Sequence, residues 1–147
     1  MQASRALDAY KQVDLESAIL SASSVQLIVM LYDGALSAIR GAKSQIERQQ
    51  FASKGRLISK AINIVSGLRA ALDFEQGGEI SQNLQDLYFY IERRLMDANL
   101  HNDTAPLDES TKLLAEVREA WVELSKTHQP AASVSKEGLG TVSYGKV

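Results

Sequence analysis

Two histidines, His101 and His128, are the side chains in this sequence best suited to proton transfer near neutral pH. His101 is expected where a helix ends, and His128 where the folded part of the chain gives way to a polar tail. The adjacent Gly77-Gly78 pair is not followed by the Lys-Ser or Lys-Thr that helps cradle nucleotide phosphates, and it follows a predicted helix instead of a strand. The sequence therefore predicts two solvated histidines and no phosphate-binding loop.

Metal and anion sites are equally weakly supported. The chain has no cysteine and no Glu-x-x-His pair of the kind that builds a di-metal carboxylate centre in a helical bundle. Arg93 and Arg94 beside Glu92 could bind a small anion, although a solvated cluster of helical charges explains them more simply. We predict no metal, no cofactor and no catalytic residue.

Two enzyme-like alternatives were weighed against this interpretation. A helical-bundle mutase would need charges that face inward, whereas Arg40, Arg48 and Arg69 fall at the edges of the apolar stripes or outside them. A phosphotransfer bundle would need an exposed histidine in the middle of a helix, and both histidines are expected at helix ends. Neither pattern is present, so the sequence favours a protein that is not an enzyme.

The 147 residues suit a single domain with one core. Hydrophobic residues make up 45% of the chain and charged residues 23%, with a net charge of -2. Basic residues are scattered among acidic ones, which argues against nucleic-acid binding. Membrane insertion is not expected, because the longest apolar run, Leu27 to Tyr32, is far shorter than the roughly 20 residues that span a bilayer. With no signal peptide in Met1 to Tyr10, we expect a cytoplasmic protein.

Apolar residues recur at helical spacing in four segments, which predicts helices over residues 24–48, 51–72 and 79–99 and after Asp103-Thr104. Short links between them predict an all-α, antiparallel up-down-up-down four-helix bundle. Trp121 is expected to anchor the core. The bundle domain is predicted to cover residues 1–128, with residues 1–20 as a short helical flap and the Ser- and Gly-rich residues 129–147 as a flexible tail.

The helices carry more apolar surface than one core requires. On the third helix Phe89, Met96 and Leu100 project opposite the stripe that contains Tyr88 and Leu95. Two explanations stay open, and both can hold: the N-terminal segment covers these side chains, or they receive an amphipathic helix of a partner protein.

Several short motifs occur in a specific order along the chain: Leu31-Tyr32-Asp33-Gly34-Ala35, Gly77-Gly78-Glu79, Tyr88-Phe89-Tyr90 and Ala120-Trp121. In this order and spacing, from about Tyr10 to Leu124, the sequence resembles the flagellin export chaperones of the FliS family. It departs from that family before the first helix, where Ser21-Ala22-Ser23-Ser24 stands in place of the usual Thr-Ala-Ser-Pro. The C-terminal tail has no counterpart in the resemblance.

The resemblance implies a cytoplasmic bundle that binds the disordered C-terminal segment of flagellin, prevents its premature polymerisation and delivers it to the flagellar type III export gate. Tyr10 and Tyr32 are predicted partner contacts from the motif. The other predicted contacts rest on helical-wheel position: Ile28, Val29, Leu36, Ile64, Phe89 and Met96. For Ile28 and Tyr32, packing in the core is an equal alternative. A regulatory adaptor that sequesters another flagellar protein is the alternative function, and both a monomer and a homodimer are compatible with the sequence.

Overall fold

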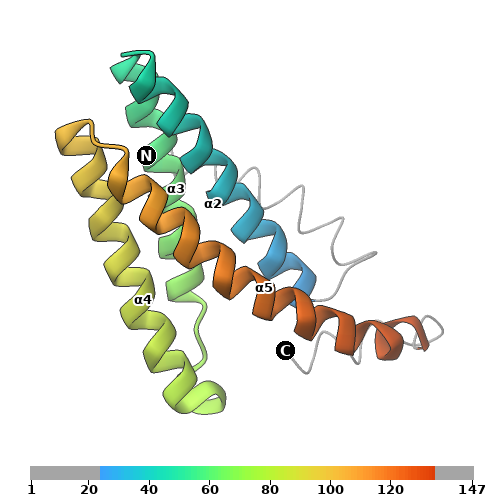
Figure 1. Cartoon of the computed structure of the whole chain (residues 1–147). Helices are drawn as coiled ribbons and strands as arrows, with labels where there is room; N and C mark the ends of the chain where they lie inside the picture. The colour runs from blue at the N-terminus through green and yellow to red at the C-terminus, as the bar shows by residue number, and fades with distance from the viewer. Residues whose placement is uncertain (1–23, 135–147) are drawn as a thin grey trace.

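The computed structural model describes residues 24–134, which form four helices. They are α2 (Ser24–Glu47), α3 (Phe51–Ala70), α4 (Phe74–His101) and α5 (Ala105–Val134). Helix α2 packs on α3 and α5, and α4 packs on the same two helices, so α2 and α4 are diagonal partners. Successive helices run antiparallel (Figure 1). The predicted all-α bundle is therefore confirmed. The predicted flap, residues 1–20, lies outside the described residues.

The core is built from the predicted stripes. Long side chains at its centre include Tyr32, Tyr88, Ile91 and Leu95, all less than 2% exposed. The remaining buried hydrophobic side chains include Val25, Ala35, Ala38, Ile39, Ala42, Ile46, Ile58, Ala61, Ile64, Val65, Leu68, Ala98, Leu107 and Leu114. Burial of these side chains supplies the main driving force for folding. Trp121 is only partly buried and packs at the edge of this cluster.

By length and composition alone, α2 is apolar enough to cross a membrane, with a mean hydropathy of 1.2 over its best window. Its apolar side chains have another explanation, because seven α2 residues are buried in the bundle. A helix that contributes many side chains to a core can be as apolar as a membrane-spanning helix, so the composition of α2 is weak evidence for a membrane span.

Helix α4 begins five residues before residue 79, where the sequence predicted its start. Asp73 caps the helix, because its Oδ1 accepts hydrogen bonds from the backbone N–H groups of Glu75 and Gln76 at 3.1 and 3.0 Å. The chain is thus helical from Phe74, and only Gly78, with φ +51° and ψ -122°, interrupts it. The predicted start at residue 79 coincides with this interruption, and the short helical stretch before it, capped by Asp73, was not predicted.

The C-terminal ends of α4 and α5 lie at different distances from the predicted helix ends. Asn102 closes α4 in the left-handed conformation, which asparagine tolerates better than most residues. Helix α5 continues to Val134, beyond Pro130, so the predicted boundary of the tail at residue 129 falls inside a helix. The rest of the predicted tail, residues 135–147, lies outside the described residues.

Polar contacts join each pair of neighbouring helices. Arg69 pairs with Glu92 between α3 and α4, and Asp33 pairs with Arg118 between α2 and α5. Ser53 donates a hydrogen bond of 3.1 Å to Gln45 between α3 and α2. Each such surface contact stabilises the fold only modestly, by about 0.2–1 kcal/mol for an ion pair. Together they fix the rotation of each helix and hence the faces turned outward.

Candidate protein-binding interface

An apolar stripe lies on the outer face of α4. Its members are Phe89, Met96 and Leu100, with exposed fractions of 43%, 56% and 76%. Their spacings of seven and four residues place them on one side of the helix, opposite the buried Ile91 and Leu95. The structure thus leaves exposed all three side chains that the sequence marked as surplus.

The aromatic end of the stripe is held by charged neighbours. The guanidinium carbon of Arg69 lies 4.2 Å from the centroid of the Phe89 ring. The same guanidinium donates hydrogen bonds to both carboxylate oxygens of Glu92, at 2.8 and 3.2 Å. This bonding raises the pKa of Arg69 further above its ordinary value, so the cation is permanent. Phe89 therefore presents a partly exposed ring beside a cation on the outer face of α4.

Two more apolar side chains are exposed, one on α4 and one on α5. Ile80 and Leu124 lie on the core-facing stripes of their helices, yet they are 69% and 39% exposed. Figure 1 shows the reason: the C-terminal half of α5 diverges from the N-terminal half of α4. Leu84 and Leu87, between these positions and the closed part of the bundle, are only partly buried.

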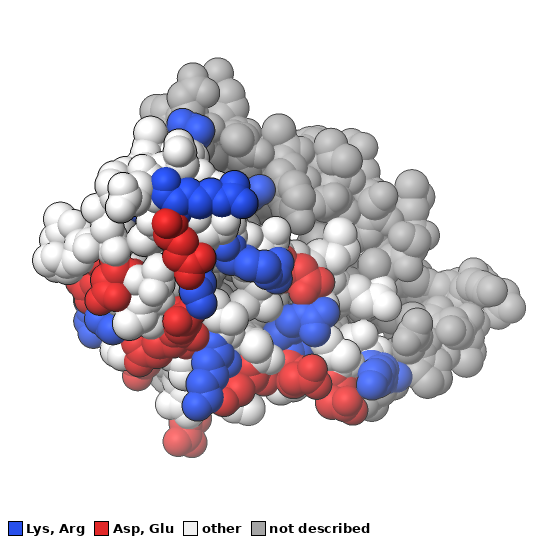
Figure 2. Space-filling view, turned by 45° about the horizontal axis from the view of Figure 1, so that its top comes forward, with Lys and Arg blue, Asp and Glu red and all other residues white. Residues whose placement is uncertain are grey.

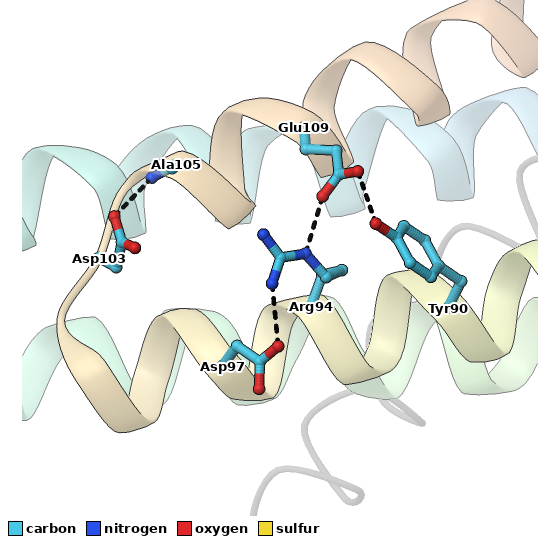
Figure 3. A network of polar contacts seen from close by, with 6 residues as sticks. All are labelled: Tyr90, Arg94, Asp97, Asp103, Ala105 and Glu109. Atoms are coloured by element: carbon cyan, nitrogen blue, oxygen red, sulfur yellow. Dashed lines mark hydrogen bonds and ion pairs between the residues drawn. The ribbon is translucent and has the colours of Figure 1, made fainter.

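A polar network joins α4 and α5 on the closed side of this divergence (Figure 3). Glu109 on α5 accepts hydrogen bonds from the Tyr90 hydroxyl at 2.6 Å and from Arg94 Nε at 2.8 Å. Arg94 also donates from Nη1 to Asp97 at 3.0 Å. The hydrogen bond from Tyr90, followed by that from Arg94, lowers the pKa of the Glu109 carboxyl. The network keeps the two helices together at this point.

Two of the predicted partner contacts have side chains inside the bundle in this conformation, so partner contact at these positions stays a prediction. Tyr32 is fully buried, and its hydroxyl oxygen lies 2.5 Å from that of Tyr88. Ile64 is 1% exposed and belongs to the core cluster. On the helical wheel, Ile64 lies beside the main apolar stripe of α3 and was therefore expected to be exposed. Helix α3 packs on both α2 and α4, so a broader face of this helix is buried, and Ile64 is part of that face.

The predicted contacts on α2 lie apart from the α4 stripe. Ile28, Val29 and Leu36 are partly buried. Asp33, which follows Val29 by one helical turn, pairs with Arg118, so Val29 and Leu36 lie on the side of α2 that faces α5. Of the predicted contacts within residues 24–134, only Phe89 and Met96 share one exposed stripe. Tyr10 lies outside the described residues.

Leu100, Ile80 and Leu124 were missing from the predicted set of contacts. Leu100 was recognisable, because it continues the Phe89 and Met96 stripe at helical spacing. Ile80 and Leu124 were not, because their positions read as core and only the divergence of α5 exposes them.

The described residues contain no group of three or more His, Asp and Glu side chains that could hold a metal ion. On the face in Figure 2, basic and acidic side chains are interspersed, with no continuous basic surface. What this part of the molecule offers to a ligand is apolar helix surface edged by charge. That combination suits another protein chain.

Comparisons with known proteins identify the family. The sequence profile described as "Flagellar protein FliS" matches residues 6–128. The flagellar secretion chaperone FliS of Salmonella typhimurium is 48% identical over 126 residues, covering 85% of this chain and 93% of that protein. FliSB of Pseudomonas aeruginosa is 46% identical over 121 residues, 82% of this chain and 96% of its own length. FliS of Bacillus subtilis is 34% identical over 106 residues, 72% of this chain and 78% of its own length.

The names of these relatives describe a chaperone in flagellar secretion, which is not an enzymatic role. This agrees with the helical architecture and with the resemblance carried by the sequence motifs. The profile match and the identities over most of the chain lead to one conclusion: this chain belongs to the FliS family of flagellar secretion chaperones.

Proposed function

We propose that this protein is a cytoplasmic chaperone that binds the C-terminal segment of flagellin, prevents its premature polymerisation and delivers it to the flagellar export apparatus. The names of its relatives support a flagellar secretion substrate. The observation that carries the proposal is the stripe of Phe89, Met96 and Leu100, which stays exposed on the side of α4 opposite the core.

The physical basis of binding is burial of this apolar surface under a partner helix. Complete burial of a Phe, Met or Leu side chain contributes about 1.5–3 kcal/mol to the free energy of binding. The three side chains of the stripe are already partly covered, so each contributes only a fraction of that value when the partner covers the rest. A segment that is disordered alone loses conformational entropy when it folds on the bundle, which lowers the net affinity and permits later release. Binding of this kind requires no nucleotide and no covalent step.

The proposal is tested by co-purification from cells that express this chain together with flagellin. We expect a 1:1 complex that is lost when the C-terminal segment of flagellin is deleted. Binding that survives this deletion would refute flagellin's C-terminal segment as the ligand. A complex with a different flagellar protein, and none with flagellin, would favour the adaptor function instead.

A pair of matched variants tests the stripe. Met96→Asp places a charge on the exposed stripe, where it must be desolvated on binding, so we expect at least a ten-fold weaker complex. Thr111→Asp puts the same charge on an exposed polar position of α5 and should bind as the wild type does. Both variants should melt within a few degrees of the wild type, because neither position is buried. Equal affinities of the two variants would exclude the stripe from the interface.

A further inference from the structure

Met96 is the one methionine within residues 24–134 whose side chain is mostly exposed. It is 56% exposed, whereas Met30 on α2 is partly buried. The third methionine, Met1, lies outside the described residues. In a chain without cysteine, the thioether sulfur of methionine is the side-chain atom most open to two-electron oxidation, and access of the oxidant decides which sulfur reacts first. Oxidation of the folded protein should therefore occur at Met96 before Met30.

The place of Met96 on α4 makes its oxidation consequential. It lies within the exposed apolar stripe, seven residues after Phe89 and four before Leu100. Oxidation to the sulfoxide converts a flexible apolar side chain into a polar one. A sulfoxide oxygen that a partner covers must give up its water, and an apolar surface offers no donor in return. One added oxygen atom thus changes the stripe between Phe89 and Leu100 from apolar to polar.

The charged neighbours of Met96 suit the oxidised side chain. Glu92, one turn before Met96, is bound through both carboxylate oxygens by Arg69, at 2.8 and 3.2 Å. Arg93 is exposed, lies three residues before Met96 and forms no ion pair or hydrogen bond with a described residue. Residues three apart are neighbours on a helix surface, so a sulfoxide oxygen at Met96 has a free guanidinium donor within reach. The open surface therefore accommodates the sulfoxide, which opposes covering by a partner.

We infer that Met96 is a reversible oxidation site, and that a peroxide acting on it weakens the binding of the partner at the stripe. A lone pair of the sulfur attacks one oxygen of hydrogen peroxide, the S–O bond forms as the O–O bond breaks, and the other oxygen leaves as water. Sulfur loses two electrons and the peroxide gains them. A methionine sulfoxide reductase, with a thiol as the reductant, removes the oxygen as water and restores the thioether. The inference rests on the proposed function, because it regulates the surface assigned to the partner.

The first experiment locates the oxidation in the full chain. The folded protein is treated with dilute hydrogen peroxide, and peptide mapping by mass spectrometry follows the sulfoxide at each methionine over time. We expect Met96 to be oxidised at least about five-fold faster than Met30, and the difference to disappear in urea. Equal rates at Met96 and Met30 in the folded protein would overturn the inference.

The second experiment measures binding of the oxidised protein to flagellin. Only the chaperone is oxidised, and the peroxide is removed before flagellin is added. We expect Kd to rise about ten-fold and to return to its starting value after treatment with methionine sulfoxide reductase. A Kd that is unchanged when Met96 carries the sulfoxide, or that the reductase does not restore, would overturn the inference.

Three variants assign the effect to one sulfur. Met96→Leu cannot form a sulfoxide, so its Kd should be the same before and after peroxide, whatever its starting value. Met30→Leu is the matched control and should keep the about ten-fold response of the wild type. Met96→Gln places a permanent polar group at the position and should bind about as weakly as the oxidised wild type. A peroxide response in Met96→Leu as large as that of the wild type would contradict the inference.

Thermal melting separates a surface effect from unfolding. Met96 lies outside the core, so the oxidised protein should melt within a few degrees of the reduced protein. A large fall in melting temperature would mean that binding is lost through unfolding, which contradicts the inference. Reduced protein that binds flagellin, with an affinity that the sulfoxide does not change, refutes the inference alone. Reduced protein that does not bind flagellin refutes the proposed function, and the inference falls with it.

Discussion

The hydroxyl oxygens of Tyr32 on α2 and Tyr88 on α4 lie 2.5 Å apart in the centre of the bundle. Their helices are diagonal partners, so this hydrogen bond crosses the core where α2 and α4 have few other contacts. Burial raises the pKa of both tyrosines. Two neutral hydroxyls thus satisfy one another in an apolar environment.

Tyr32→Phe should destabilise the fold by about 1–3 kcal/mol, because it leaves the buried Tyr88 hydroxyl without its partner. The double variant Tyr32→Phe/Tyr88→Phe should lose less than the sum of the two single variants, because both partners are then removed together. Urea unfolding followed by fluorescence of the single tryptophan measures these free energies. Additive losses would show that the two hydroxyls do not interact.

Lys54→Met should also be destabilising, by about 1–3 kcal/mol. The Lys54 ammonium is largely buried and donates to the backbone oxygen and the Oδ1 of Asn99, at 3.0 and 2.8 Å, in the last turn of α4. Methionine preserves the side-chain volume and removes these donors. Arg56→Met on the exposed side of α3 is the control, with an expected change within about 0.5 kcal/mol. Thermal melting of both variants compares the two positions, and equal losses would contradict this role for Lys54.

Glu109→Gln should destabilise the protein in a manner that depends on pH. The pKa of Glu109 is lowered in the folded state, so its stabilising contribution is present above the unfolded pKa of about 4.5 and is lost as pH falls through the lower folded value. The difference in unfolding free energy between the wild type and Glu109→Gln should therefore be constant near pH 7 and should shrink below pH 4.5. Denaturant titrations at a series of pH values test this, and a difference that grows with acidity would refute it.

Gly78→Ala and Gly55→Ala should have opposite effects. Gly78 has a φ of +51°, so a side chain there is strained by about 1–3 kcal/mol although no atom obstructs it. Gly55 lies within α3, and a Cβ at this position would meet only Asn99 Oδ1 at 3.9 Å, an ordinary contact. Alanine at Gly55 should therefore stabilise α3 by about 0.5–1 kcal/mol. Thermal melting curves give the melting temperature of each variant relative to the wild type. Stabilisation by Gly78→Ala would show that the interruption in α4 is dispensable.

The sequence by itself determined the four helices, their antiparallel order and most of the core, because helical periodicity is a local property of the chain. Tyr88 and Leu95 could be assigned to the core, and Phe89 and Met96 to the outside, from their angular positions on one helix. The motif order also determined the family, which the comparisons then established.

Only the tertiary structure decided how fully each stripe is covered. Ile64 was expected at an interface and is buried, whereas Ile80 and Leu124 occupy core positions and are exposed. The physical reason is that burial depends on where neighbouring helices lie, and the path of α5 away from α4 is set by contacts between residues far apart in sequence. Periodicity specifies the direction in which a side chain points, and the packing of the other helices decides what it meets there.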